Sequence, residues 1–370
     1  MHILIAILGL AIILLILWDG FETMVLPRRV TRKIRITRLF YRTTWQLWSA
    51  IGRRMALGKR REAFLSIYGP LSLFLLFFLW GVTLLVAFGL LNWAAGGESF
   101  LSGLYMSGSS FFTLGSLPAH IRLQKVISIA EAGMGMAFFA LVISYLPVMY
   151  QSFSKREMVI SLMDARAGSP AAALELLRRY GHSQGMDTLP DLLRAWERWS
   201  AGLLESHVSY PVLVYFRSQH DNQSWLAALT TILDTCTLVI HGVGGSTGWQ
   251  AQLTFAMARH AVVDLAQILR SAPKPPDPER LPPADFDRVV STLRKAGIDL
   301  AGDRENAAKI QELRAMYEPF VNSLADYLLL RLPPWLHSGR VDNWRTSAWG
   351  RISASASVLP LADLGDDEHA

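Results

Sequence analysis

The sequence predicts an all-α membrane protein with three transmembrane helices, a re-entrant loop between the second and third, and an all-α cytosolic domain. Hydrophobic residues make up 51% of the 370 residues and charged residues only 18%. Apolar runs long enough to cross or nearly cross a bilayer occur before residue 153. Beyond that point the chain alternates amphipathic runs with loops, which is typical of a helical globular domain.

Positive charge is concentrated in one segment. The net charge of the chain is +6, but between Phe21 and Ala63 twelve cations face two acids, so the remainder of the chain is net negative. Positive charge in a short loop beside a membrane helix stays cytoplasmic. The basic segment is therefore predicted to lie on the cytoplasmic side of the membrane. This position argues against a nucleic-acid partner, because the cations lie between two apolar segments.

The first predicted element, residues 1–24, is a transmembrane helix. Its apolar run from Ile3 to Trp18 rises only about 24 Å as a helix, slightly less than the hydrocarbon core of a bilayer. A cleaved signal peptide is the competing interpretation, but a basic n-region and a small-x-small cleavage site are both missing. We therefore expect an uncleaved helix with its N-terminus outside.

Residues 25–63 form the basic cytoplasmic juxtamembrane segment. Aromatic and aliphatic residues are interleaved with the cations, and many of them recur at the spacing of a helix. This pattern predicts an amphipathic helix, with anionic membrane lipid as the partner of residues 28–62. The alternative is a retention loop whose aromatic residues pack on the helix bundle.

Residues 64–153 contain two apolar helices, Phe64–Trp93 and about Val126–Tyr150, separated by a short helix rich in Ser and Gly. The stretch Ser107–Pro118 follows that short helix and is too polar to cross lipid. Non-helical backbone persists at membrane depth only where it is buried in protein or faces a water-filled path. The order of segments therefore predicts a pore. The alternative is a polar loop that only packs the bundle.

This order resembles the pore-loop potassium channels with two pore-domain helices. Thr113-Leu114-Gly115 lies where their Thr-Val-Gly-Tyr-Gly filter begins. Four residues in and just before the third span resemble their inner helix: Arg122, Glu131, Ala132 and Gly133. The resemblance covers residues 64–153. It implies a homotetramer through which a monovalent cation passes, with K⁺ as the candidate. We expect no cofactor and no structural metal site.

By this resemblance, the ion pathway would be formed by backbone carbonyls and hydroxyls of four consecutive residues: Thr113, Leu114, Gly115 and Ser116. The sequence departs from the family where Ser116 replaces the aromatic residue, Leu117 the second glycine and Pro118 the following acid. Leucine resists positive φ and proline fixes its own φ. We therefore do not expect the outer half of a four-site potassium filter to form.

Four residues of the third span are candidates for pore support or gating: Glu131, Gly133, Gly135 and Pro147. An ionisable residue within a membrane helix is a functional-site hypothesis by default, so Glu131 could brace the filter or attract cations. The two glycines allow close helix packing, and Pro147 allows a bend near the cytoplasmic end. The alternative is that these residues only permit tight packing.

The cytosolic domain is predicted over residues 154–358, followed by a flexible tail at 359–370. We expect a helix stop before Ser169, which would cap the next helix with Pro170 in its first turn. Tyr210–Phe216 is either a strand or a buried helix, and no further segment is expected to be long and apolar enough to span. The expected helices are Ala171–Tyr180, Leu189–Glu205, Ser224–Ile240, Trp249–Arg270, Asp285–Lys295 and Asp303–Leu330.

The cytosolic domain contains no firm enzymatic motif. The glycine-rich stretch His241–Gly248 lacks a P-loop lysine, so a loop joining two helices is favoured. Ser152–Lys155 fits the bare Ser-x-x-Lys spacing without its partner motifs. His220, His241 and His260 have no metal-ligand spacing, and Cys236 is expected to be a buried helical side chain.

The sequence therefore predicts a non-enzymatic cation channel subunit in the inner (plasma) membrane. Its C-terminal domain would be cytoplasmic and would gate the pore. The alternative is a non-conducting membrane sensor or scaffold in which the pore loop is a relic.

Overall fold

The computed structural model is helical throughout the residues it describes, with no strand among them. These are residues 1–26, 35–116, 121–181, 183–220, 222–243, 245–300 and 304–336, without the side chains of residues 183, 184 and 304. The predicted all-α fold class is confirmed for this part of the chain. Leu117, Pro118, the cations between residues 28 and 33, and the tail at 359–370 lie outside the described residues.

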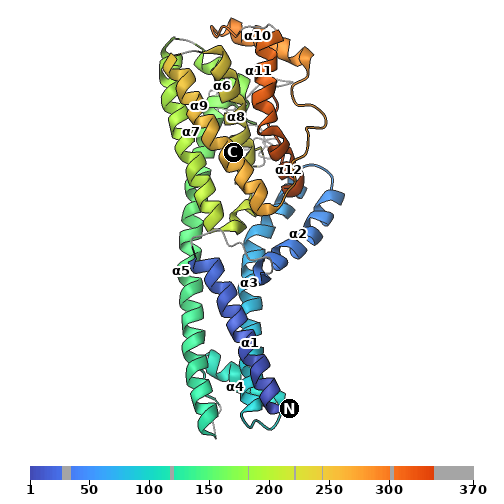
Figure 1. Cartoon of the computed structure of the whole chain (residues 1–370), viewed down its shortest axis with the longest axis vertical. Coiled ribbons are helices and arrows are strands. Elements are labelled where there is room, and N and C mark those ends of the chain that lie inside the picture. The colour runs from blue at the N-terminus through green and yellow to red at the C-terminus, as the bar shows by residue number, and fades with distance from the viewer. Residues whose placement is uncertain are drawn as a thin grey trace, which may run out of the picture. The chain divides into compact units, whose positions relative to one another are not determined.

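The helices follow one another in the order labelled in Figure 1. The first five are α1 (His2–Gly20), which continues as a π-helical turn to Val25, α2 (Ile36–Arg54), α3 (Lys59–Ala94), α4 (Phe100–Phe111) and α5 (Arg122–Ala167). The rest are α6 (Ala173–Tyr180), α7 (Ser183–Ser209), a 3-10 helix at Pro211–Tyr215, α8 (Trp225–Gly242), α9 (Gly245–Leu269), α10 (Pro283–Lys295), α11 (Arg304–Ala315) and α12 (Glu318–Leu328).

The chain divides into two compact units. Unit 1 comprises Met1–Ala56, Ala63–Ser152 and Val208–Phe216, and unit 2 comprises Leu57–Glu62, Phe153–His207 and Arg217–Ala370. Unit 1 therefore contains α1, α2, α4 and most of α3, together with the first two thirds of α5. Unit 2 contains α6 to α12 and the last turns of α5.

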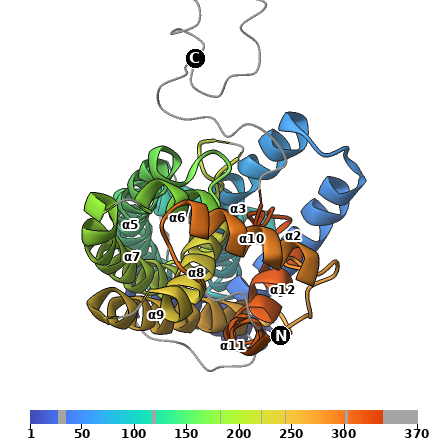
Figure 2. The ribbon, with the colours of Figure 1, turned by 90° about the horizontal axis from the view of Figure 1, so that it is seen from above.

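Four helices are long and apolar enough to cross a membrane: His2–Val25, α3, α5 and α8. The first three contain the predicted spans, which is compatible with a multi-pass membrane protein. The expectation that no later helix would qualify is wrong, because α8 has the length and composition of a span. Its surface is covered within unit 2, where it packs against α6, α9, α11 and α12 (Figure 2). A helix that is apolar all round is buried, and here protein buries it.

Two local predictions in unit 2 are corrected. Ser169 is not a helix cap, because α6 begins at Ala173 and Ala172 precedes it in an extended conformation. The segment expected over Asp303–Leu330 is two helices, since Pro319 occupies the first turn of α12 and cannot continue the hydrogen bonding of α11. In unit 1, Tyr210–Phe216 contains a buried 3-10 helix and no strand, so the second of the two alternatives left open for this segment is confirmed.

The aromatic side chains of α2 pack on the helix bundle. Trp45 is only 2% exposed and lies 4.8 Å, centroid to centroid, from the ring of Tyr68 and 5.0 Å from that of Tyr215. Trp48 stacks on Phe64 at 4.4 Å. The aromatic face of α2 is thus fixed against α3 and Val208–Phe216, so the segment is helical as first predicted, while its aromatic residues pack on protein as the alternative proposed.

Candidate functional site

The predicted ion-pathway residues form the turn that ends α4. The helix begins at Ser99, whose hydroxyl accepts a hydrogen bond from the Ser102 N–H at 3.2 Å, a standard N-cap. It ends at Phe111, and the next residues include two with left-handed backbone: Thr113 (φ 55°) and Gly115 (φ 62°). Glycine adopts this conformation without strain, whereas a β-branched threonine does so rarely. The turn therefore has an unusual backbone at Thr113.

All four amide donors of residues 113–116 are directed back into α4. The N–H of Thr113 donates to Ser110 O at 3.0 Å, and that of Leu114 to Ser109 O at 2.8 Å. The N–H of Gly115 also reaches Ser109 O, and the Ser116 N–H and hydroxyl both contact the Ser109 hydroxyl at 2.9 Å. Ser109 is thus the side chain that organises the turn, and the sequence analysis did not identify it.

The carbonyl oxygens of the same four residues are available. Within the described part of the chain, none of them accepts a hydrogen bond. Residues 112–116 are exposed, and the Leu114 side chain is 70% exposed. The four amide donors of the turn are therefore satisfied by α4, whereas its four carbonyl oxygens have no hydrogen-bond donor among the described residues.

Small residues let α4 approach both of its neighbours closely. A Cβ on Gly103 would lie 2.5 Å from Gly89 O in α3, and a Cβ on Gly135 would lie 2.3 Å from Phe111 O at the end of α4. Neither distance is possible for a real side chain, so both sites require glycine. The end of α4 and its turn are consequently held against α5.

Glu131 connects the three helices of this site. It is fully buried, and its carboxyl group contacts the hydroxyl of Ser107 in α4 and the side-chain amide of Asn92 in α3, the latter at 3.5 Å. Ser107 also donates to Leu85 O at 2.8 Å. A buried carboxyl group needs such partners. The structure thus brings Glu131 to the back of α4 and not to the exposed turn.

The other two predicted support residues lie elsewhere on α5. Gly133 is exposed, and a Cβ added there would meet no heavy atom within 4 Å, whereas Gly135, two residues later, is buried. Pro147 is exposed and lies within the continuous helix. Only Glu131 and Gly135 among the four are therefore in contact with the turn-bearing helix.

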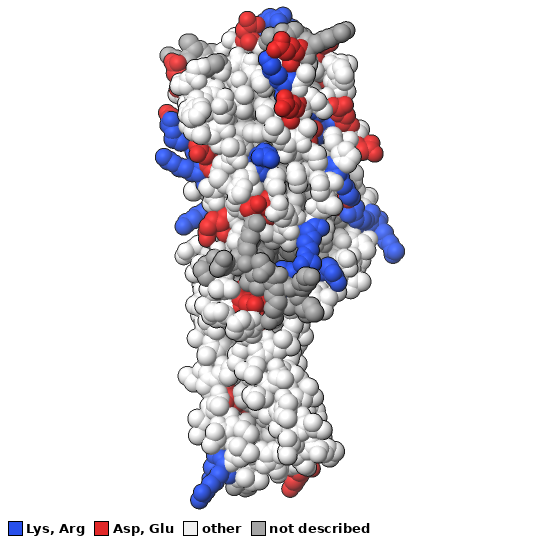
Figure 3. Space-filling model, viewed as in Figure 1, with Lys and Arg blue, Asp and Glu red and all other residues white. Residues whose placement is uncertain are grey.

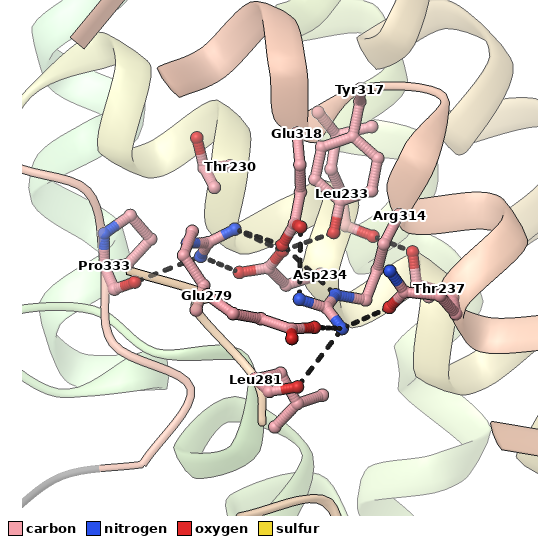
Figure 4. A network of polar contacts seen from close by, with 12 residues as sticks. Thr230, Leu233, Asp234, Thr237, Glu279, Leu281, Arg314, Tyr317, Glu318 and Pro333 are labelled. Carbon is pink, nitrogen blue, oxygen red and sulfur yellow. Dashed lines mark hydrogen bonds and ion pairs between the residues drawn. The ribbon is translucent and has the colours of Figure 1, made fainter. Parts of the chain in front are cut away.

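Unit 2 contains a buried ionic cluster centred on Asp234 of α8 (Figure 4). Arg280 donates to both oxygens of Asp234, at 2.6 and 3.2 Å, to Glu318 at 3.0 Å and to Pro333 O at 3.0 Å. Arg314 donates to both oxygens of Glu318 at 3.1 Å, and the Tyr317 hydroxyl donates to Asp234. The cluster ties α8 to three separate segments, namely the stretch before α10, the α11–α12 junction and residues near 333.

Burial dominates the electrostatics of this cluster. It raises the pKa of Glu318, against the opposing effect of Arg280 and Arg314, and it raises the pKa of Tyr317 well above its ordinary value. The arginines therefore stabilise carboxylates that water does not reach. The arrangement has the partners of a structural network, and it presents no free nucleophile or open face for a substrate.

A second buried polar pair in unit 2 joins α5 to α7. Arg156 Nη1 lies 3.2 Å from His207 Nε2, and His207 Nδ1 lies 2.8 Å from Leu203 O. Burial and the neighbouring Arg156 charge lower the pKa of His207 to about 3. The imidazole is therefore neutral, with Nδ1 donating to Leu203 O and Nε2 accepting from Arg156. The sequence analysis missed His207 because its neighbours in sequence give no sign of the pair.

The remaining sequence candidates do not assemble into a site. The glycine-rich stretch His241–Gly248 was expected to be a loop joining two helices, but α8 continues to Gly242 and α9 begins at Gly245, so most of the stretch belongs to these helices. Cys236 is buried in α8 as expected. Among the described residues, no three His, Cys, Asp or Glu side chains are placed to share a metal ion.

Comparison of the chain with protein-family models, with curated proteins and with solved structures found no match. The turn after α4 and the residues that hold it are therefore the features of the chain that point to a function.

The glycine pair in α5 provides a test of the packing around the turn. We expect Gly135→Ala to lower the free energy of unfolding by about 1–3 kcal/mol, because the added methyl group overpacks against Phe111 O. Gly133→Ala is the matched control and should be neutral or stabilising by up to about 1 kcal/mol, because alanine favours the helix. Denaturant unfolding of the detergent-solubilised chain measures both. Equal effects of the two substitutions would contradict the close approach of α4 to α5.

The Asp234 cluster predicts strong coupling between two residues distant in sequence. Asp234→Ala and Arg280→Ala should each destabilise the chain by about 3–5 kcal/mol, because each leaves a buried charge without its partner. The double substitution should cost less than the sum of the two, with a coupling of about 1–3 kcal/mol. Arg194→Ala, which breaks an exposed pair with Asp191, is the control and should cost less than about 1 kcal/mol. Additive effects would show that the pair is not coupled.

His207 predicts a loss of stability in mild acid. The unfolded chain takes up a proton near the ordinary His pKa of 6.5, whereas the folded chain does so only near 3. Stability conferred by the neutral imidazole is therefore complete above pH 6.5 and falls as the pH decreases through this window. Between pH 7 and pH 5 the loss should be about 2 kcal/mol. His207→Gln should remove this component, as measured by the difference between the two unfolding curves at each pH. The same pH dependence of stability in His207→Gln and in the parent would contradict a neutral, buried His207.

Proposed function

We propose that the chain is a subunit of an oligomeric membrane pore that conducts monovalent cations past the turn at Thr113–Ser116. One observation carries the proposal. Among the described residues, the four carbonyl oxygens of the turn accept no hydrogen bond, while its four amide donors are bonded into α4. Rings of backbone carbonyls replace the hydration shell of a cation in selectivity filters. A turn with the opposite polarity would attract anions.

The same geometry requires more than one copy of the chain. A single exposed turn presents one arc of oxygens, which cannot replace the hydration shell of an ion on all sides. A ring of copies around a common axis would surround the ion with oxygens on all sides. The resemblance to potassium channels makes a homotetramer the expected assembly. The apolar residues exposed on α5, such as Phe139 and Ile143, would then face lipid, neighbouring subunits or the inner cavity.

The turn favours a short ion site with weak discrimination among monovalent cations. Ser116 stands where potassium channels have an aromatic residue, and its hydroxyl contacts Ser109 in α4. Its hydroxyl is thus engaged behind the turn, so the ligands offered outward are mainly carbonyls. We expect K⁺ to be conducted, together with other monovalent cations, because the sequence beyond Ser116 lacks the second filter glycine.

Glu131 would act as a positioning residue for this pore. It contacts Ser107 and Asn92, so it fixes α4 between α3 and α5 from behind the turn. No cation pairs with its carboxyl group in the described part of the chain. Its distance from the exposed carbonyls argues for bracing over direct contact with the ion.

Gly115→Asp provides the test of conduction. We expect purified protein in liposomes to mediate a cation flux, and Gly115→Asp to abolish it. Aspartate at positive φ is strained, and its side chain would enter the space in front of the carbonyls. Gly202→Asp, at an exposed glycine of α7 with no heavy atom near a Cβ position, is the control and should leave flux unchanged.

The outcomes separate the pore from its alternative. Flux that survives Gly115→Asp would exclude this turn as the ion pathway. No flux from the folded parent protein, over a range of gradients, would favour the non-conducting sensor or scaffold.

A further inference from the structure

The outward face of α2 combines exposed aliphatic side chains with exposed arginines. Leu39, Leu47 and Ile51 are 53%, 70% and 52% exposed. Arg54 lies on the same side of the helix and is exposed as well, and the exposed Arg42, one turn after Leu39, lies at the edge of this face. The opposite face holds Thr37, Trp45 and Gly52, all buried. The apolar and basic residues of α2 are thus displayed on the one face that the rest of unit 1 does not cover.

The orientation of this face is fixed at the start of α2. Asp19, at the end of α1, accepts hydrogen bonds from the Thr37 N–H at 3.1 Å and the Thr37 hydroxyl at 2.6 Å, and it also accepts from Trp80 Nε1 at 3.3 Å. Asp19 is fully buried. The carboxylate therefore caps α2 from a different helix. This contact places the start of α2 at the polar end of an apolar helix long enough to span a membrane.

The two arginines of the outward face have no acidic partner in the described part of the chain, where no carboxylate pairs with Arg42 or Arg54. Arg35, by contrast, lies 3.4 Å from Glu22 in an ion pair on the inner side. Figure 3 shows basic side chains gathered at α2, while charged atoms are scarce over α1 and the adjoining stretch of α3. The face thus requires an anionic counterpart.

We propose that this face of α2 binds the surface of an anionic bilayer. The aliphatic residues would insert among the upper acyl chains, and the arginines would contact lipid phosphates. A second copy of the chain is a poorer occupant, because a symmetric contact through this face would oppose arginine to arginine. The proposal does not depend on ion conduction, since it concerns only how α2 meets lipid.

Site-specific quenching by lipid tests the proposal in the full chain. Leu47→Cys is labelled with bimane and the protein is reconstituted into bilayers that contain brominated phosphatidylglycerol or brominated phosphatidylcholine. The unaltered chain reports any labelling of the buried Cys236. We expect quenching in both lipids, and greater quenching by the anionic one, because each arginine near the surface enriches anionic lipid about fivefold at low salt.

Two charge-matched variants complete the design. Arg42→Gln and Arg54→Gln together should bring the ratio of quenching by the two lipids to about one. Arg198→Gln and Arg259→Gln together remove the same charge from exposed positions of unit 2 and should leave the ratio as in the parent.

Three results would overturn the proposal. Absence of quenching by either lipid would show that protein covers the face. Equal quenching in the parent would show contact without preference for anionic lipid. An equal loss of preference in both double variants would show that overall charge, and not this face, attracts the lipid.

Discussion

The close contact of α4 with α3 and α5 is the constraint on which the candidate site depends. A helix of twelve residues has few side chains with which to anchor itself, and α4 is anchored by backbone approach at Gly103 and Gly135 and by the carboxyl group of Glu131. Each contact limits a different movement. The glycines set how near the helices lie, and Glu131 sets how far α4 slides along them. Together, the glycines and Glu131 fix the position of the turn that follows α4.

Buried polar groups have a comparable role in both units. Asp19 links α1 to α2, Glu131 links three helices in unit 1, and Asp234 links α8 to three segments of unit 2. Each of these side chains would be costly to bury alone. Because their partners come from distant parts of the sequence, they penalise alternative packings as well as stabilising this one. In apolar helices with many near-equivalent packing faces, such penalties define a unique arrangement.

The sequence predicted the features that depend on local patterns. Hydropathy located α1, α3 and α5, since a span needs a long apolar run whatever its neighbours are. The order of segments located α4 and its turn. Features that depend on distant partners were not predictable. Gly133 and Gly135 are equivalent in the sequence, and only the position of Phe111 makes the second essential. The same holds for Ser109, His207 and the protein-covered α8, whose composition resembles that of a span.

The polarity of the turn has a consequence for how the pore would assemble. Four carbonyl oxygens that accept no hydrogen bond from the described residues are tolerable beside water, but they would be unfavourable against lipid. Leu114 and Phe112 next to them are largely exposed and apolar, so the same turn presents one surface suited to water and another suited to protein or lipid. A ring of copies satisfies both, because it directs the oxygens to a central water-filled axis and the apolar side chains to the adjoining subunits. The isolated chain satisfies only one of them, which is a physical reason to expect assembly before conduction.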